Sequence, residues 1–374
     1  MSSPEIVSHA LTKRNPVEEN VEAVTNRDKG LTYILDRFRP EDAPGVVELF
    51  KAVYGDGYPV RLFYDAQALM EANKTGQYIT VVARLPEGRV ISVHNFFRSA
   101  PYEQLYEFGV GLTLPDYRGA GVSNLLGKYA VERVLVTLDT EEAFGEQVCY
   151  HIHTQKMCAS QGFAETAIEV ALMPAEAYTR EKATGGRVAT TLAFRCLKPS
   201  PHTVYVPQTY AELISSLYSI LDDSRELLPS SQEVPEGLST VSRVQLFDFA
   251  QVARIAVEQA GADLESHLAK IEDDAREKGF LVFQAWLKLS CPWVGQAVKA
   301  LNKHGYFIGG ILPRWFDQDG LLMQKLFCPP YFEEIRLYSD QAKKILAAVQ
   351  EDWRRVTRER SSPGGQAWVG GENA

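Results

Sequence analysis

Apolar residues in the first half of the chain recur with two periods, one typical of strands and the other of helices. Short runs rich in β-branched and aromatic residues and bounded by turn residues predict strands. These runs cover residues 33–38, 77–84, 89–97, 103–114, 147–153, 164–173 and 187–197. Helical spacing follows Pro40, where Val46, Phe50 and Val53 fall on one face, and it returns from Val122 to about residue 137. A further short helix is expected to end at Gln161.

The order of these predicted elements, β-α-α-β-β-β-α-β-α-β-β, decides the fold class. Several strands follow one another without an intervening helix, which is not the pattern of a doubly wound parallel sheet. The sequence therefore predicts a mixed α/β (α+β) fold, in which a central mixed, mostly antiparallel sheet is flanked by helices.

The second half of the chain repeats part of this order. Strands are expected over residues 241–257, 280–289, 306–312 and 321–327, and helices over 262–278 and 293–304. His304-Gly305-Tyr306 follows its helix as Gln161-Gly162-Phe163 does in the first half. We therefore favour a duplicated fold over a chance likeness between two α/β units.

Composition places the boundaries of the two predicted domains. Residues 1–30 are polar and lack a sustained apolar period, so they are predicted to be an extension. Two prolines between Lys198 and His202 are typical of a joint. This gives a first domain over residues 31–200 and a second over 201–357. Residues 358–374 are rich in Gly, Pro and Ser and are predicted to be a disordered tail.

Charge and cysteine usage limit the partners. The chain has 374 residues and a net charge of −9, whereas a nucleic-acid backbone attracts clustered Lys and Arg, so we expect no nucleic-acid partner. Its five cysteines are scattered without a Cys-x-x-Cys pair, the pattern of thiols in a reducing compartment. The sequence shows neither a secretory signal nor an apolar stretch of membrane length, so a cytoplasmic protein without a membrane partner is expected.

Two histidines are candidate metal ligands. His151 and His153 would share one face of the strand predicted over residues 147–153. A zinc site needs further ligands, and no third candidate stands nearby in the sequence. We therefore interpret both as hydrogen-bonded structural residues and expect no metal.

One loop between a predicted strand and a predicted helix carries the candidate chemistry. It reads Pro115-Asp116-Tyr117-Arg118-Gly119-Ala120-Gly121-Val122-Ser123-Asn124. Glycines let a backbone approach an anion, and the unpaired N–H groups at a helix start suit a pyrophosphate. Arg118 adds a permanent positive charge. A Gly-rich turn without a ligand explains the composition equally well.

Two other phosphate loops do not fit this stretch. A Rossmann fingerprint needs a third glycine, but the chain has Asn124 there. A P-loop needs Gly-Lys followed by Ser or Thr, but Tyr129 follows Lys128. Neither nucleotide-binding motif is therefore predicted.

The stretch from Leu112 to Leu126 resembles the acyl-CoA signature of the GNAT superfamily of N-acyltransferases, Arg/Gln-x-x-Gly-x-Gly/Ala. Arg118 and Gly121 match its first two fixed positions, and Ser123 replaces the small residue at the third. The run Cys158-Ala159-Ser160-Gln161-Gly162-Phe163 resembles the family's second signature, a short helix ending in Gly-Phe. The order of elements over residues 31–200 agrees, so the resemblance covers the whole first domain.

The resemblance implies an N-acetyltransferase that moves an acyl group from acetyl-CoA directly to an amine. The reaction would pass through a tetrahedral intermediate that main-chain N–H groups stabilise, without an acyl-enzyme. Leu112, Thr113 and Leu114 are expected beside the pantetheine arm of acetyl-CoA, the cosubstrate. Its pyrophosphate is expected on the loop that follows, formed by Arg118, Gly119, Ala120, Gly121, Val122, Ser123 and Asn124.

The sequence indicates the catalytic acid and base less clearly than the CoA-binding loop. Family members often use a carboxylate on the fourth strand, where Glu107 stands, and Glu103 is expected on the same face; solvated strand charges are an equal alternative. The family's frequent acid is a tyrosine four residues before the Gly of Gly-Phe, a position that holds Cys158 here. A thiol can protonate a thiolate of similar pKa, although buried cysteines are more often inert. Tyr106 and Tyr102 are candidate substitutes.

The second domain departs from the signature. Its corresponding stretch, Gly261-Ala262-Asp263-Leu264-Glu265-Ser266, has no arginine, and Leu264 stands where the first copy has Gly121. Acidic and bulky side chains would repel and block a pyrophosphate, so a CoA-free second copy is expected. It is expected to pack against the first, to shape the acceptor groove or to mediate assembly, for which a homodimer is a candidate.

Three functions therefore remain in view. The leading hypothesis is an acetyl-CoA-dependent N-acyltransferase with an amine acceptor of unknown identity. A non-catalytic acyl-CoA-binding regulatory module is an alternative, because the usual tyrosine is missing. In a third reading the enzyme acts on a protein or aminoacyl acceptor, because paired folds of this kind can form long grooves.

Overall fold

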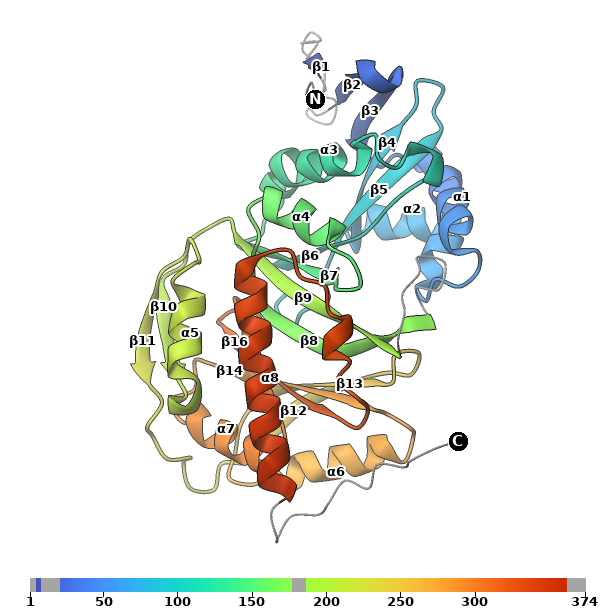
Figure 1. The fold of residues 1–374 in the computed structure, drawn as a ribbon. Coiled ribbons are helices and arrows are strands. Elements are labelled where there is room, and N and C mark those ends of the chain that lie inside the picture. The colour runs from blue at the N-terminus through green and yellow to red at the C-terminus, as the bar shows by residue number, and fades with distance from the viewer. Residues whose placement is uncertain (1–4, 8–20, 177–185, 362–374) are drawn as a thin grey trace. The chain divides into compact units, whose positions relative to one another are not determined.

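The computed structural model describes residues 5–7, 21–176 and 186–361 (Figure 1). The chain divides into two compact units, unit 1 formed by Met1–Glu146 with Met157–Gly162, and unit 2 formed by Gln147–Lys156 with Phe163–Ala374. This division falls before the joint predicted at residues 198–202. A division into compact units does not test where one copy of a duplicated fold ends and the next begins. The predicted domains 31–200 and 201–357 therefore stay predictions.

Unit 1 is built on a sheet whose strands follow one another in chain order. They are β1 (Glu5–Val7), β2 (Glu22–Asn26), β3 (Leu31–Arg37), β4 (Tyr78–Arg84), β5 (Val90–Phe97), β6 (Leu105–Thr113) and β7 (Glu142–Val148). Neighbouring strands are antiparallel up to β6, which is parallel to β7. The helices are α1 (Ala43–Tyr54), α2 (Ala66–Lys74), α3 (Val122–Tyr129) and α4 (His153–Ser160), whose last residues belong to this unit.

Local sequence explains why these elements pack as they do. The apolar face of α1 predicted from Val46, Phe50 and Val53 is buried. Arg84 on β4 joins two further elements through buried ion pairs, each of 2.8 Å, with Asp36 on β3 and Asp42 before α1. Buried charges need such partners, so this cluster fixes α1 against the sheet.

Two sequence-based expectations for this region are wrong. The extension predicted over residues 1–30 contains β2, in which Val24 is completely buried opposite Tyr33. The strand predicted over residues 147–153 lies earlier, as β7, because Ala143 and Phe144 are the residues buried against β6. Both errors concern short strands that are defined by pairing with another strand, β3 for β2 and β6 for β7.

The strands of unit 2 are also mixed in direction. In spatial order they are β9 (Arg187–Cys196), β8 (Ala164–Pro174), β15 (Phe307–Leu312), β16 (Gly320–Leu326), β14 (Val282–Lys288), β13 (Val252–Gln259) and β12 (Val241–Phe247). Only β13 and β14 are parallel among these pairs. A separate parallel pair is formed by β10 (His202–Val206) and β11 (Arg225–Pro229).

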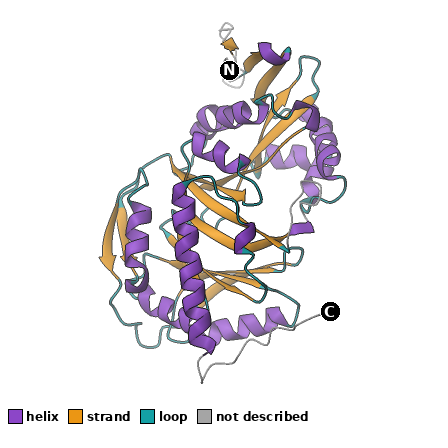
Figure 2. Ribbon diagram, viewed as in Figure 1, coloured by secondary structure: helices purple, strands orange, loops and turns teal. Residues whose placement is uncertain are grey.

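Four helices complete unit 2 in the described part of the chain: α5 (Ala211–Tyr218), α6 (Leu264–Arg276), α7 (Val294–Lys303) and α8 (Asp340–Ser361). Figure 2 shows strands flanked by helices in both units, so the predicted mixed α/β class is confirmed. Every helix and strand predicted between residues 241 and 327 is present, although the run 241–257 is a hairpin of two strands. Among the described helices, none combines the length and apolar character needed to cross a bilayer.

Candidate acyl-CoA site

The edge of β6 opens partway along the strand. β6 pairs with β7 only from Leu105 to Glu107, while its pairing with β5 continues to Thr113. Leu114 donates its N–H to the Ile91 carbonyl at 2.9 Å. Main-chain N–H and C=O groups alternate in direction along an antiparallel strand. Those of Leu112 therefore also point to β5, and those of Gly111 and Thr113 point to the opposite edge of β6. In the described chain no strand pairs with that side beyond Glu107.

A bulge marks the point where this open edge begins. Val110 and Gly111 both stand opposite His94, which shifts the register between β5 and β6. Val110 has φ of 49°, in a region that β-branched residues avoid at a cost of about 1–3 kcal/mol. The buried Asn95 amide donates to the Val110 carbonyl at 2.9 Å and holds the strained turn. The bulge is therefore a fixed feature of the strand.

The loop after β6 presents unpaired amides. Gly119 and Gly121 have φ of 74° and 78°, which explains glycine at both positions. Gly121 immediately precedes α3, and no side chain caps this helix start. Within the described residues, the main-chain N–H groups of residues 119–124 have no hydrogen-bond acceptor; the first helical bond runs from Leu125 N–H to the Gly121 carbonyl at 3.1 Å. A row of donors thus stands at the positive end of a helix dipole.

Arg118 connects this loop to the open edge. Its Nε donates to the Thr113 carbonyl at 3.2 Å, and the residue is exposed. Thr113 is further held by a 2.7 Å contact between its hydroxyl and that of Ser92. The structure thus places Thr113 at the β6 edge in contact with Arg118, which precedes the amide row at residues 119–124. Leu112 and Leu114, also predicted beside the pantetheine arm, instead direct their main-chain groups to β5.

The two catalytic candidates on β6 point in different directions. Successive strand residues face opposite sides of a sheet, so Tyr106 and Glu107 cannot serve the same face. The buried Tyr106 hydroxyl accepts a hydrogen bond from Arg98, whose guanidinium lies 4.5 Å from the ring centre. Glu107 accepts a hydrogen bond from the Ser99 hydroxyl.

The surroundings of Glu107 include an aromatic cluster. Burial, and then the charge of Glu107, raise the pKa of Tyr78 to about 12. Tyr78 in turn stacks on Phe97, with ring centroids 5.1 Å apart. Glu103, predicted to share the Glu107 face, instead lies in the turn before β6 and is exposed. That prediction is wrong because the strand begins only at Leu105.

The remaining acid candidates lie elsewhere. Cys158 on α4 is only 3% exposed. This end of α4 lies against α3, because a Cβ on Gly127 would come within 3.1 Å of the Met157 sulfur. Tyr102 donates to the Gln104 side chain at 3.2 Å. The two histidines considered as metal ligands do not share a strand face, because β7 ends at Val148 and His153 begins α4.

One buried residue of this region was missed from the sequence. His94 on β5 is 3% exposed, and its Nε2 lies 3.2 Å from the Ser123 carbonyl and 3.1 Å from the Ser123 hydroxyl. Burial lowers the pKa of His94 to about 4, although the hydrogen bond to Ser123 acts in the opposite direction. A single histidine in an apolar strand gives no signal in the sequence, and only the fold brings it to the loop.

The corresponding turn of unit 2 differs in its hydrogen bonding. Gly261 N–H donates to the Thr240 hydroxyl at 3.0 Å, and Ala262 N–H donates to the Leu238 carbonyl at 2.9 Å. A Cβ on Gly261 would lie 2.3 Å from the Ser239 main chain. The chain itself occupies the space before these amides, which supports the expectation of a CoA-free second copy.

Comparison with known proteins gives matches of fold only. No family model matches the chain, and no curated protein matches it. The ribosomal-protein-S5-alanine acetyltransferase from Vibrio fischeri is similar over 44% of this chain and 92% of its own, with 13% identity and a TM-score of 0.36. The ribosomal-protein-S18-alanine N-acetyltransferase from Escherichia coli gives 45% and 96% coverage, 13% identity and a TM-score of 0.35.

A GNAT-family acetyltransferase from Streptococcus pneumoniae gives 44% and 99% coverage, 15% identity and a TM-score of 0.36. At these scores and identities the likeness says nothing of substrate or site residues. All three of these solved structures are acetyltransferases, and the Streptococcus pneumoniae protein is described as a member of the GNAT family, whose signature the first domain resembles.

Proposed function

We propose that the first domain binds an acyl-CoA and transfers its acyl group to an amine. The observation that supports this most is the row of unbonded main-chain N–H groups at residues 119–124, next to the open edge of β6. Amides at a helix start hold phosphate groups well, because both the donors and the helix dipole favour negative charge. Arg118 adds a fixed positive charge beside them.

The open edge suits the amide-bearing pantetheine arm. An extended chain can add to a sheet edge through main-chain hydrogen bonds, and Gly111 and Thr113 direct their main-chain groups there. Acyl-CoA supplies an acyl group activated as a thioester. The Gly111 N–H, beside the bulge, is the donor we assign to the acyl oxygen as negative charge develops on it.

Glu107 is the proposed base. A carboxylate held by Ser99 can take a proton from the attacking amine, so that its nitrogen forms the new C–N bond as the C–S bond breaks. The proton needed by the leaving thiolate is assigned to Cys158, because Tyr106 lies on the opposite face of β6 from Glu107. Holding both reactants in place supplies much of the rate in such a transfer.

Calorimetric titration of the full chain with acetyl-CoA tests the proposal. We expect one site per chain, and no detectable binding by Arg118→Glu, because the new charge would repel the pyrophosphate. Lys128→Glu is the matched control, since Lys128 is exposed in the last turn of α3, away from the amides. Equal binding by wild type and Arg118→Glu would contradict the proposal.

A second candidate function is acyl-CoA sensing without catalysis. It is favoured by Cys158, a buried thiol where the resembled family usually has a tyrosine. Thiol release from acetyl-CoA, measured with a panel of polyamines, amino acids and peptides, separates the two. Turnover with any amine rejects sensing, whereas binding without turnover across the panel rejects the transferase.

A further inference from the structure

His94 joins the two halves of the proposed acyl-CoA site. On one side its ring lies against the bulge of β6, where a Cβ on Gly111 would come within 2.2 Å of His94 Nδ1. On the other side its Nε2 contacts Ser123 in the first turn of α3, at 3.2 Å from the carbonyl and 3.1 Å from the hydroxyl. One side chain therefore spans from the open strand edge to the helix start.

The contacts of Nε2 indicate the tautomer that we assign to the ring. Because the Ser123 carbonyl can only accept, the assigned tautomer carries its proton on Nε2, which donates to Ser123. Nδ1 then bears the lone pair and faces Gly111. With burial lowering the pKa of His94 to about 4, the ring is neutral near pH 7.

Packing holds the ring in this place. His94 stacks on Phe108 of β6, with centroids 5.2 Å apart, and is almost completely buried. The absence of a side chain at Gly111 makes room for it. A side chain confined in this way loses little further freedom when it bonds, so it can orient its partner.

The contact with His94 also explains why Ser123 departs from the resembled signature. The third fixed position of that signature is Gly or Ala, neither of which carries a hydroxyl. Here the Ser123 hydroxyl gives His94 a second contact in addition to the carbonyl. The departure from the signature and the buried histidine thus belong to one contact.

We propose that His94 is a positioning residue that holds the amides of Val122, Ser123 and Asn124 in register with the Gly111 edge, so that one acyl-CoA engages both. This inference rests on the proposed function. In this proposal His94 contacts neither the pyrophosphate nor the reacting atoms. Its effect on binding passes through the first turn of α3.

Coenzyme A titrations of full-chain variants test the donor role. His94→Phe keeps the ring but removes the donor, and we expect binding about three- to tenfold weaker, the size of one lost hydrogen bond. His94→Gln restores an N–H and should recover most of the affinity. His267→Phe is the matched control, because His267 also contacts a serine, with Nε2 2.8 Å from the Ser242 hydroxyl, but lies in unit 2.

The possible results separate the two proposals. Equal losses in His94→Phe and His94→Gln, or wild-type affinity in His94→Phe, overturn the positioning role while leaving the proposed function intact. A wild-type chain that does not bind coenzyme A overturns both. Nitrogen NMR of the ¹⁵N-histidine-labelled wild type needs no variant to fold: protonated Nε2 with a signal that shifts on coenzyme A addition is expected, and protonated Nδ1 overturns the inference.

Discussion

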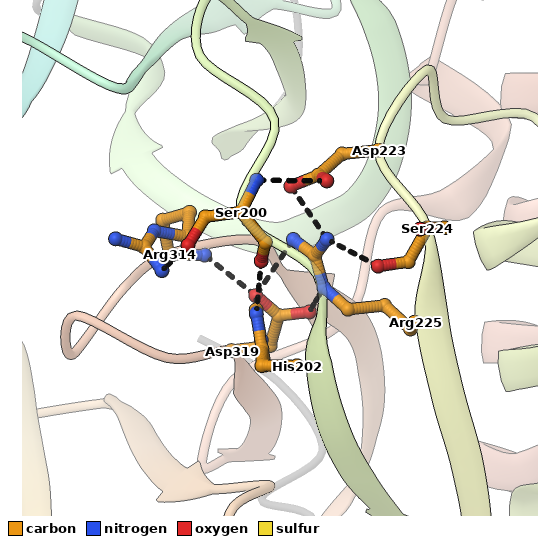
Figure 3. Close-up of polar contacts among 7 residues, drawn as sticks. All are labelled: Ser200, His202, Asp223, Ser224, Arg225, Arg314 and Asp319. Atoms are coloured by element: carbon orange, nitrogen blue, oxygen red, sulfur yellow. Dashed lines mark hydrogen bonds and ion pairs between the residues drawn. The ribbon is translucent and has the colours of Figure 1, made fainter.

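Arg225 and Asp319 meet inside unit 2 through two hydrogen bonds, from Nε to Oδ2 at 2.7 Å and from Nη2 to Oδ1 at 3.2 Å (Figure 3). Both side chains are almost completely buried. His202 Nε2 lies 3.3 Å from Asp319 Oδ1, and Asp223 contacts the other side of the Arg225 guanidinium. Since His202 begins β10 and Arg225 begins β11, this cluster attaches the parallel pair to the loop before β16.

Removing the charge of Asp319 should destabilise the protein strongly. Asp319→Asn leaves the buried Arg225 without its bidentate partner, and breaking such a pair typically costs about 3–5 kcal/mol. Equilibrium unfolding in urea measures the loss. As a control, Arg243→Gln breaks an exposed pair with Glu258 and should cost less than about 1 kcal/mol. If Asp319→Asn lowers the free energy of unfolding no more than Arg243→Gln does, the buried cluster contributes little to stability.

His202 should make stability depend on pH. Burial opposes its charging, but the hydrogen bond and charge of Asp319 outweigh it and raise the pKa of His202 above 6.5. The charged form is thus favoured by folding, and its contribution is full below pH 6.5 and is lost as pH rises through the folded-state pKa. Melting temperatures measured from about pH 5.5 to 9 should show this loss in wild type and a flatter profile in His202→Asn. Parallel profiles would refute the coupling.

Gly111 should tolerate no side chain while His94 is present. A methyl group in Gly111→Ala would lie 2.2 Å from His94 Nδ1, so either the ring or the bulge must move. We expect a loss of about 1–3 kcal/mol in the free energy of unfolding, as in an overpacked core. The double variant with His94→Ala should cost less than the sum of the two single changes. Additive losses would mean that the ring and the bulge do not share this space.

Gly121→Ala should separate backbone strain from ligand binding. At φ of 78° with no atom near the added Cβ, the cost is conformational, about 1 kcal/mol. Gly279→Ala at φ of 85° provides the same strain in unit 2, likewise with open space. Denaturation should give similar losses for both, whereas calorimetry with acetyl-CoA should show weaker binding only for Gly121→Ala. Weaker binding by both variants would point to a global effect.

Much of the fold follows from periodicity. The apolar face of α1 and the β-rich runs of β4 and β5 lie where the pattern predicts them, because most of their apolar residues are buried. The glycines at residues 119 and 121 likewise indicate left-handed backbone. The mixed α/β class and the loop that carries the candidate chemistry could therefore be predicted from the sequence alone.

Other features depend on which elements come into contact. β2 is a strand because it pairs with β3, and β7 lies at Glu142–Val148 because those residues reach β6. The amides at residues 119–124 have no acceptor, whereas those of Gly261 and Ala262 donate to Thr240 and Leu238. The two turns differ because residues 238–240 fold back onto the turn of unit 2. The sequence alone determined the fold class, most of the apolar faces and the Gly-rich loop, but not the burial of Val24 or His94. Only the tertiary structure decided which edges, amides and side chains meet, because those contacts depend on how the elements pack.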